Sequence, residues 1–167
     1  MNVIEQTKAD LFQQIGKTVL ILQNLERLMA DTLKHGSDSS LSVSQINALD
    51  KRTMGALITI LRQRVELADT FLGELESLLQ DRNVLIHSLA FQEWFDMDST
   101  CGQLKLLKLL QSINSRAEHA VMIFLGYRLA TSNESGTKPE DYSDEPHRNF
   151  VAEIQRDYLR GINPKTR

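Results

Sequence analysis

Three side chains that can do chemistry lie within one apolar run, Leu78–Ala90, which reads LLQDRNVLIHSLA. Arg82 carries a permanent positive charge, and its planar guanidinium can hold a phosphate through two parallel hydrogen bonds. His87 carries an imidazole, a group that can either accept or donate a proton. Asn83 adds an amide that could orient a bound phosphate or the imidazole. Together these residues predict proton transfer beside a fixed cation.

The same residues also fit an ordinary helix surface. Arg82 continues a series of apolar residues at spacings of three and four, where its aliphatic stem could pack while its charged end reaches water. Asn83 and His87 are four residues apart and could hydrogen-bond each other on one face. A regular helix turns about 100° per residue, which separates Arg82 from His87 by about 140°. We therefore expect that one chain alone does not aim both at the same phosphate.

The residues around this run predict an all-α protein. Aromatic residues make up only 6% of the 167 residues, and the periodic stretches are rich in Leu, Ala, Gln, Glu and Arg, which favours helix over strand. Helical patterns cover residues 3–34, about 45–89 and about 104–130, with Gly55 and Gly73 as weak points of the second. We expect an antiparallel helical bundle of about four to five helices.

The chain divides by composition into three parts. Residues 1–130 are expected to form the bundle, residues 131–149 a polar acidic linker or mobile loop, and residues 150–167 a C-terminal accessory helix and tail. Within the second helical pattern, six apolar residues alternate steps of four and three along one narrow seam: Leu61, Val65, Ala68, Leu72, Leu75 and Leu79. Such a seam packs against another helix, either in the same chain or in a partner.

Charge and cysteine content limit the classes of function. A formal net charge of −3 disfavours a protein that binds nucleic acid through bulk charge, although it leaves room for a local basic cleft. The single cysteine, Cys101, cannot form an intrachain disulfide and is expected to be a small buried apolar residue. No apolar stretch reaches the length of a membrane span, and the N-terminal residues lack the pattern of a signal peptide. The sequence therefore predicts a cytoplasmic protein with no membrane segment.

The segment around Arg82 resembles the signature of the HEPN domain family (higher eukaryotes and prokaryotes nucleotide-binding). That signature is an arginine, usually followed by a polar residue, with a histidine four to six residues after the arginine. Arg82, Asn83 and His87 match its form Arg-Asn-x-x-x-His, and residues 84–86 match its apolar filling. The preceding stretch TMGALITILRQRVELADTFLGELESLLQ looks like the helix before the motif in small HEPN proteins. The resemblance covers roughly residues 3–130.

The resemblance implies a metal-independent endoribonuclease that is a toxin or defence effector and needs no cofactor. Cleavage of RNA without a metal needs a base for the 2′-OH proton, an acid for the leaving oxygen and a cation for the phosphate. His87 suits proton transfer and Arg82 suits the phosphate. In the family, two protomers bring their motif helices together in one cleft. The resemblance therefore also implies a homodimer, with the seam as its apolar surface, and an antitoxin or regulatory protein as a further partner.

Further residues are auxiliary candidates. Glu26 resembles the polar residue that many HEPN domains place on the first helix facing the motif, although a solvated helix face explains it equally well. Ser88 follows the histidine, and Leu89 stands where the HEPN toxins paired with a nucleotidyltransferase antitoxin often carry a tyrosine. Trp94 could stack on an RNA base or anchor its loop to the core. The alternative function is a non-catalytic HEPN-fold adaptor or regulatory protein that binds a protein partner or a nucleotide.

Overall fold

The computed structural model describes residues 3–35, 42–133, 145, 148–149 and 162–164. Its α-helices are α1 (Val3–His35), α2 (Val43–Leu49), α3 (Met54–Arg64), α4 (Asp69–Asn83) and α5 (Thr100–Asn133). A π-helical turn, Val84–Ser88, and a 3-10 turn, Leu89–Phe91, continue from α4. Two short strands, β1 (Val65–Leu67) and β2 (Ile162–Pro164), pair antiparallel with Val65 opposite Pro164. The structure is mostly helical, which confirms the all-α class.

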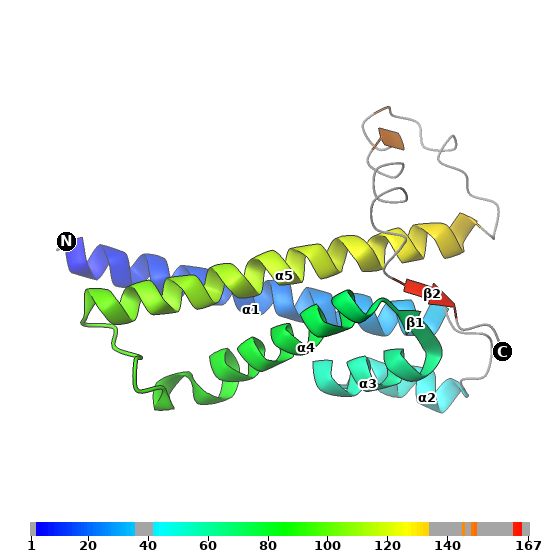
Figure 1. Ribbon diagram of the computed structural model, residues 1–167, viewed down its shortest axis with the longest axis horizontal. Helices are drawn as coiled ribbons and strands as arrows, with labels where there is room; N and C mark the ends of the chain where they lie inside the picture. The colour runs from blue at the N-terminus through cyan, green and yellow to red at the C-terminus, as the bar shows by residue number, and fades with distance from the viewer. Residues whose placement is uncertain (1–2, 36–41, 134–144, 146–147, 150–161, 165–167) are drawn as a thin grey trace.

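The two longest helices lie side by side along the length of the molecule (Figure 1). Both run in the same direction, and Lys8 near the start of α1 forms an ion pair with Asp98, just ahead of α5. The chain returns through α4 before α5 begins, so α4 is antiparallel to both long helices (Figure 1). The antiparallel arrangement expected from the sequence therefore applies to α4, whereas α1 and α5 form a parallel pair.

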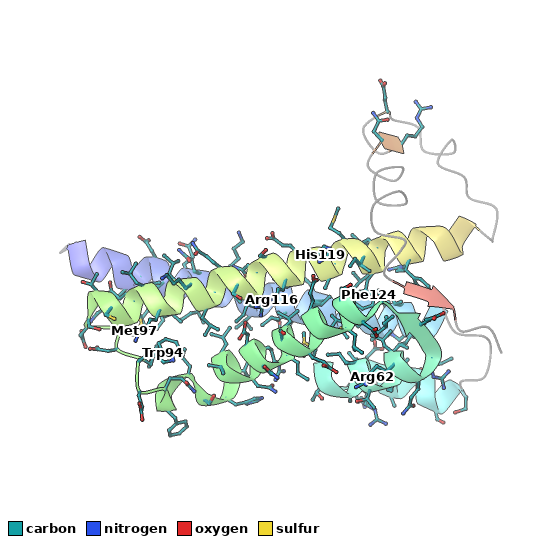
Figure 2. All side chains as sticks on the ribbon, viewed as in Figure 1. Arg62, Trp94, Met97, Arg116, His119 and Phe124 are labelled. Carbon is teal, nitrogen blue, oxygen red and sulfur yellow. The ribbon has the colours of Figure 1, made fainter. Side chains whose placement is uncertain are left out.

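The core lies between α1, α3, α4 and α5. Leucines of all four helices are buried in one cluster, and Phe124 of α5 packs edge-on against Phe71 of α4 with ring centroids 5.7 Å apart (Figure 2). The helices expected over residues 3–34 and 104–130 are confirmed as α1 and α5. Their periodicity is local and long, which is why the sequence indicates them well.

The helical pattern expected over residues 45–89 divides into three helices. Its breaks fall between α2 and α3 and at β1, and not at Gly55 or Gly73, which lie inside α3 and α4. Residues Val65–Leu67 are extended because they pair with β2, which comes from the other end of the chain. Tertiary pairing therefore overrides the local helical pattern at this point.

The expected dimerisation seam is part of the core of a single chain. Leu61, Val65 and Leu75 are at most 3% exposed. The other three members are partly buried and pack against the same core: Ala68, Leu72 and Leu79. Because β1 interrupts the helix, the six residues form no continuous stripe. The prediction that this seam pairs two protomers is therefore wrong.

The loop that leads into α5 is fixed by apolar anchors. Trp94 and Met97 are partly buried and pack against the core, and Figure 2 shows both on this loop. The loop backbone passes very close to α5, since a Cβ on Gly102 would lie 2.1 Å from the Asp96 carbonyl oxygen. Only glycine leaves room for that approach. Cys101 is exposed at the start of α5, so its expected burial is wrong.

The C-terminal predictions fall largely outside the described residues. Residues 131–133 complete α5, and of the expected linker beyond them only residues 145, 148 and 149 are described. The accessory helix expected from residue 150 also lies outside them, and of the tail after it residues 162–164 are described and form a strand. No helix among the described residues is long and apolar enough to cross a membrane.

Candidate functional site

The motif lies where α4 changes into a wider helical turn. Arg82 and Asn83 end α4, and His87 belongs to the π-helical turn Val84–Ser88. In a π-helix the backbone hydrogen bonds join residues five apart instead of four, so side chains at that spacing share a face. Arg82 and His87 have this spacing. The expected divergence of about 140° applies to a regular α-helix and is wrong here.

The guanidinium of Arg82 contacts both other motif residues. Its Nη1 lies 3.0 Å from His87 Nε2 and donates to Asn83 Oδ1 at 3.3 Å. A guanidinium has donors only, so Nε2 must be the acceptor, and the neutral ring carries its proton on Nδ1. Asn83 therefore contacts Arg82 and not His87, which was its partner in the surface-helix alternative.

Glu26 of α1 holds the other side of the guanidinium. Its Oε1 accepts a hydrogen bond from Arg82 Nη2 at 3.3 Å and another from the backbone N–H of Met54 at 3.2 Å. Met54 begins α3, where the N-cap residue Thr53 forms no side-chain hydrogen bond. One carboxylate thus satisfies a free N–H at the start of α3 and orients the motif arginine. Glu26 faces the motif from a different helix.

The two partners of this ion pair are largely covered, whereas His87 is open to solvent. The side chains of Glu26 and Arg82 are 21% and 17% exposed. His87 and Asn83 are both exposed. A ligand can therefore reach the imidazole, while Glu26 holds the guanidinium from the side of α1.

The end of the π-helical turn is held by side-chain hydrogen bonds. Ser88 Oγ lies 3.5 Å from the Val84 carbonyl oxygen. Gln92 Nε2 donates to the Ser88 carbonyl oxygen at 3.3 Å and to Ser88 Oγ at 3.4 Å. Ser88 therefore supports the turn and does not point at the site. Gln92 could not be predicted as part of the site, because its one signal in the sequence is its spacing of four from Ser88.

A second set of polar contacts joins α4 to α5. Asp81 Oδ2 accepts from Arg116 Nη1 at 2.7 Å and from Ser112 Oγ at 3.4 Å. Further along, Glu74 Oε2 lies 2.6 Å from His119 Nδ1. Figure 2 shows Arg116 and His119 on α5, next to α4. These contacts fix α4 in place and so fix the position of the motif at its end.

The remaining candidates fall outside this cluster. Trp94 packs against the core and lies edge-on to Phe95 with ring centroids 6.3 Å apart, as expected for a loop anchor. Its stacking on an RNA base stays a prediction. Within the described part of the chain, no three His, Cys, Asp or Glu side chains are grouped so that they could hold a metal ion.

Comparison of the chain with protein-family models, with curated proteins and with solved structures gives no match. The geometry of Arg82, His87 and Glu26 and the sequence signature are therefore the observations that bear on function.

Proposed function

We propose that this protein is a metal-independent endoribonuclease of the HEPN type, acting as a toxin or defence effector. The observation that supports this most is the 3.0 Å contact between Arg82 Nη1 and His87 Nε2 at an exposed turn. Side chains this close can act on a single sugar–phosphate link. RNA brings its own nucleophile, the 2′-OH, so the protein has to supply only proton transfer and a cation.

The reaction can be written with these residues. A base removes the 2′-OH proton, O2′ attacks the phosphorus, and the P–O5′ bond breaks as an acid protonates O5′. The products are a 2′,3′-cyclic phosphate and a free 5′-OH. The Nη1 hydrogens of Arg82 now bind His87 and Asn83. A phosphate that takes over these hydrogens would release the Nε2 lone pair to act as the base.

The ion pair with Glu26 gives Arg82 a fixed direction during this exchange. Nη2 of Arg82 remains bound to Glu26 while Nη1 changes partner from His87 to the phosphate. A charged donor that is already oriented stabilises the charge growing on the phosphate oxygens without having to reorganise. Glu26 is therefore proposed as a positioning residue for Arg82.

The reaction needs an acid as well as a base, and the motif of one chain brings one imidazole. We propose that a second copy of the chain supplies the second imidazole in a homodimer. The buried seam is excluded as the contact surface. Ile86 and Phe91, which are 40% and 84% exposed, lie one residue before and four residues after His87 and offer apolar surface for such a contact.

The alternative function is a non-catalytic adaptor or regulatory protein that binds a protein partner or a nucleotide. One observation favours it: the guanidinium of Arg82 already has three hydrogen-bond partners, Glu26, Asn83 and His87. Such a network could simply stabilise the end of α4. An antitoxin or regulator as a further partner fits either function.

Incubation of purified protein with mixed RNAs in excess EDTA separates the two functions. We expect the wild type to cleave RNA and to leave 2′,3′-cyclic phosphate ends. His87→Ala should lower the rate by about 100-fold or more, since acid–base catalysis contributes at least that much. His119→Ala is the matched control, because it removes an imidazole that pairs with Glu74 on the α5 side.

Circular dichroism and light scattering must show that His87→Ala keeps its helicity and its association state. If the wild type leaves RNA intact, and its overproduction changes neither growth nor cellular RNA, the adaptor function replaces the nuclease. Equal loss of activity in His87→Ala and His119→Ala would also contradict the assigned role of His87.

A further inference from the structure

A pocket of about 380 Å³ lies beside the motif, between α1 and the segment that joins α2 to α3. Its size is within the range of small-ligand sites, about 300–1,000 Å³. Ala30 and Leu49 line it and are buried, so it has apolar surface in its interior. Gln23 and Glu26 contribute polar groups from α1. The pocket therefore combines apolar walls with a few side chains that could orient a ligand.

The unpaired charge of the pocket is positive. Arg27 and Arg52 line it, both are exposed, and no ion pair within the described part of the chain involves either. The third cation, Lys34, bridges Asp50 and Asp31, and the hydrogen bond that it donates to Asp50 raises the pKa of Lys34. Lys34 stays protonated at neutral pH and offsets part of the charge of these carboxylates. Two guanidiniums remain available to an anion.

Glu26 joins the pocket to the motif. Its carboxylate lines the pocket, and its Oε1 is 3.3 Å from Arg82 Nη2. One side chain therefore separates the pocket from the Arg82–His87 pair. Because that oxygen already accepts hydrogen bonds from Arg82 and from the Met54 N–H, part of its charge is compensated. A polyanion that lies over Arg82 would reach Arg27 and Arg52 on the other side of Glu26.

We propose that this pocket is a substrate subsite that holds the nucleotide next to the cleaved link of a single-stranded RNA. Arg27 and Arg52 would bind its phosphate, and its sugar or base would pack against Ala30 and Leu49. A single strand fits because its nucleotides can be splayed into a concave site, whereas those of a duplex cannot. The inference rests on the proposed endoribonuclease. It also explains how a chain of net charge −3 could bind RNA, by grouping guanidiniums on one side.

RNA binding by the cleavage-inactive full-length chain tests this subsite. His87→Ala protein is titrated with a fluorescent single-stranded RNA of mixed sequence at several salt concentrations. In this background, Arg27→Gln with Arg52→Gln should weaken binding about tenfold or more, because charge-assisted hydrogen bonds are strong. The slope of log affinity against log salt should become shallower by about 0.7 if one phosphate is lost and about 1.4 if two are lost.

Two matched double variants make the result specific. Lys105→Gln with Lys108→Gln removes the same charge from exposed positions on α5, and binding should change by less than the loss of a full phosphate contact. Arg27→Lys with Arg52→Lys keeps the charge, so the salt slope should stay close to that of the parent. Circular dichroism checks that each variant is folded.

The proposed subsite is contradicted if Arg27→Gln with Arg52→Gln weakens RNA binding no more than the double lysine variant of α5 does. Cleavage by the protein with His87 intact is measured separately. A protein that cuts RNA with unchanged affinity after the Arg27 and Arg52 substitutions is a nuclease without this subsite. A protein that loses RNA binding on these substitutions, yet never cuts, has the subsite without the nuclease function.

Discussion

Two consecutive residues of α4, Asp81 and Arg82, make polar contacts with different helices. Asp81 faces α5, where Arg116 and Ser112 donate to one of its oxygens. Arg82 faces α1 and the surface, where it donates to Glu26 and also to an exposed imidazole. Both contacts join helices through an arginine and a carboxylate. Only the one at Arg82 includes a group that can transfer a proton, and this difference separates a structural ion pair from a candidate site.

The two histidines next to α4 repeat this contrast. Nδ1 of His119 lies 2.6 Å from a carboxylate oxygen of Glu74, which can only accept, so the ring nitrogen donates. Nε2 of His87 lies 3.0 Å from a guanidinium, which can only donate, so the ring nitrogen accepts. A base acting on an RNA phosphate needs a lone pair next to a cation, and Nε2 of His87 offers one once the phosphate takes over the hydrogen that Arg82 donates to it. His119 lacks that setting, although it is the same residue type.

The largest difference in the rate of RNA cleavage is expected between the alanine variants of Arg82 and Arg116. Arg82→Ala is expected to lower the rate of RNA cleavage in EDTA by about 10²–10³, which is the usual cost of losing one donor to a developing anion. Arg116→Ala should leave the rate within a few fold, because Arg116 contacts Asp81 on the α5 side. Initial rates on a labelled RNA measure both. Equal losses would mean that Arg82 acts through stability and not through the phosphate.

The contact between Asp81 and α5 is expected to matter for the free energy of unfolding. Asp81→Ala leaves Arg116 without its carboxylate and Ser112 without its acceptor, and should lower the free energy of unfolding by about 1 kcal/mol or more. Denaturant unfolding measures this loss. Glu76→Ala is the control, because the exposed pair of Glu76 with Arg62 is worth about 0–1 kcal/mol. If Asp81→Ala reduced cleavage without reducing stability, the assignment of this contact to the fold would be wrong.

The smallest effect is expected at the support of the π-helical turn. Gln92→Ala removes the hydrogen bonds to Ser88 and should lower the cleavage rate about three- to tenfold, since small misplacements of a catalytic group are costly. Its free energy of unfolding should change by less than about 0.5 kcal/mol, as for most surface substitutions. The control is Gln111→Ala on the exposed face of α5. An unchanged rate would show that the turn needs no support from Gln92.

Features of the fold that have local causes could be predicted from the sequence, whereas a feature whose cause lies far along the chain could not. The long helices α1 and α5, of 33 and 34 residues, follow from the apolar periodicity of residues 3–34 and 104–130. The break at Val65 could not be predicted, because its cause is pairing with Pro164 at the other end of the chain. The π-helical turn has no sequence signal either, since VLIHS contains neither glycine nor proline.

The same distinction applies to the candidate site. Residue type and spacing predict Arg82 and His87 as site residues. Their contact depends on the π-helical turn, for which the sequence carries no signal. The family resemblance indicates Glu26. Residue periodicity could not, because a contact between residues 56 positions apart produces no periodic pattern in the sequence. The sequence does not indicate Arg27 and Arg52 of the pocket, because nothing in it distinguishes them from other exposed arginines.

The most direct test of the central claim, that one chain holds His87 Nε2 against the Arg82 guanidinium, is the tautomer of the His87 ring. Nitrogen-15 NMR of labelled protein at alkaline pH, where the imidazole is neutral, reports which ring nitrogen carries the proton. The wild type is predicted to carry it on Nδ1 and to lose that preference in Arg82→Ala. A proton on Nε2 in the folded wild type would contradict the claim, because that nitrogen could then accept no hydrogen bond from Arg82.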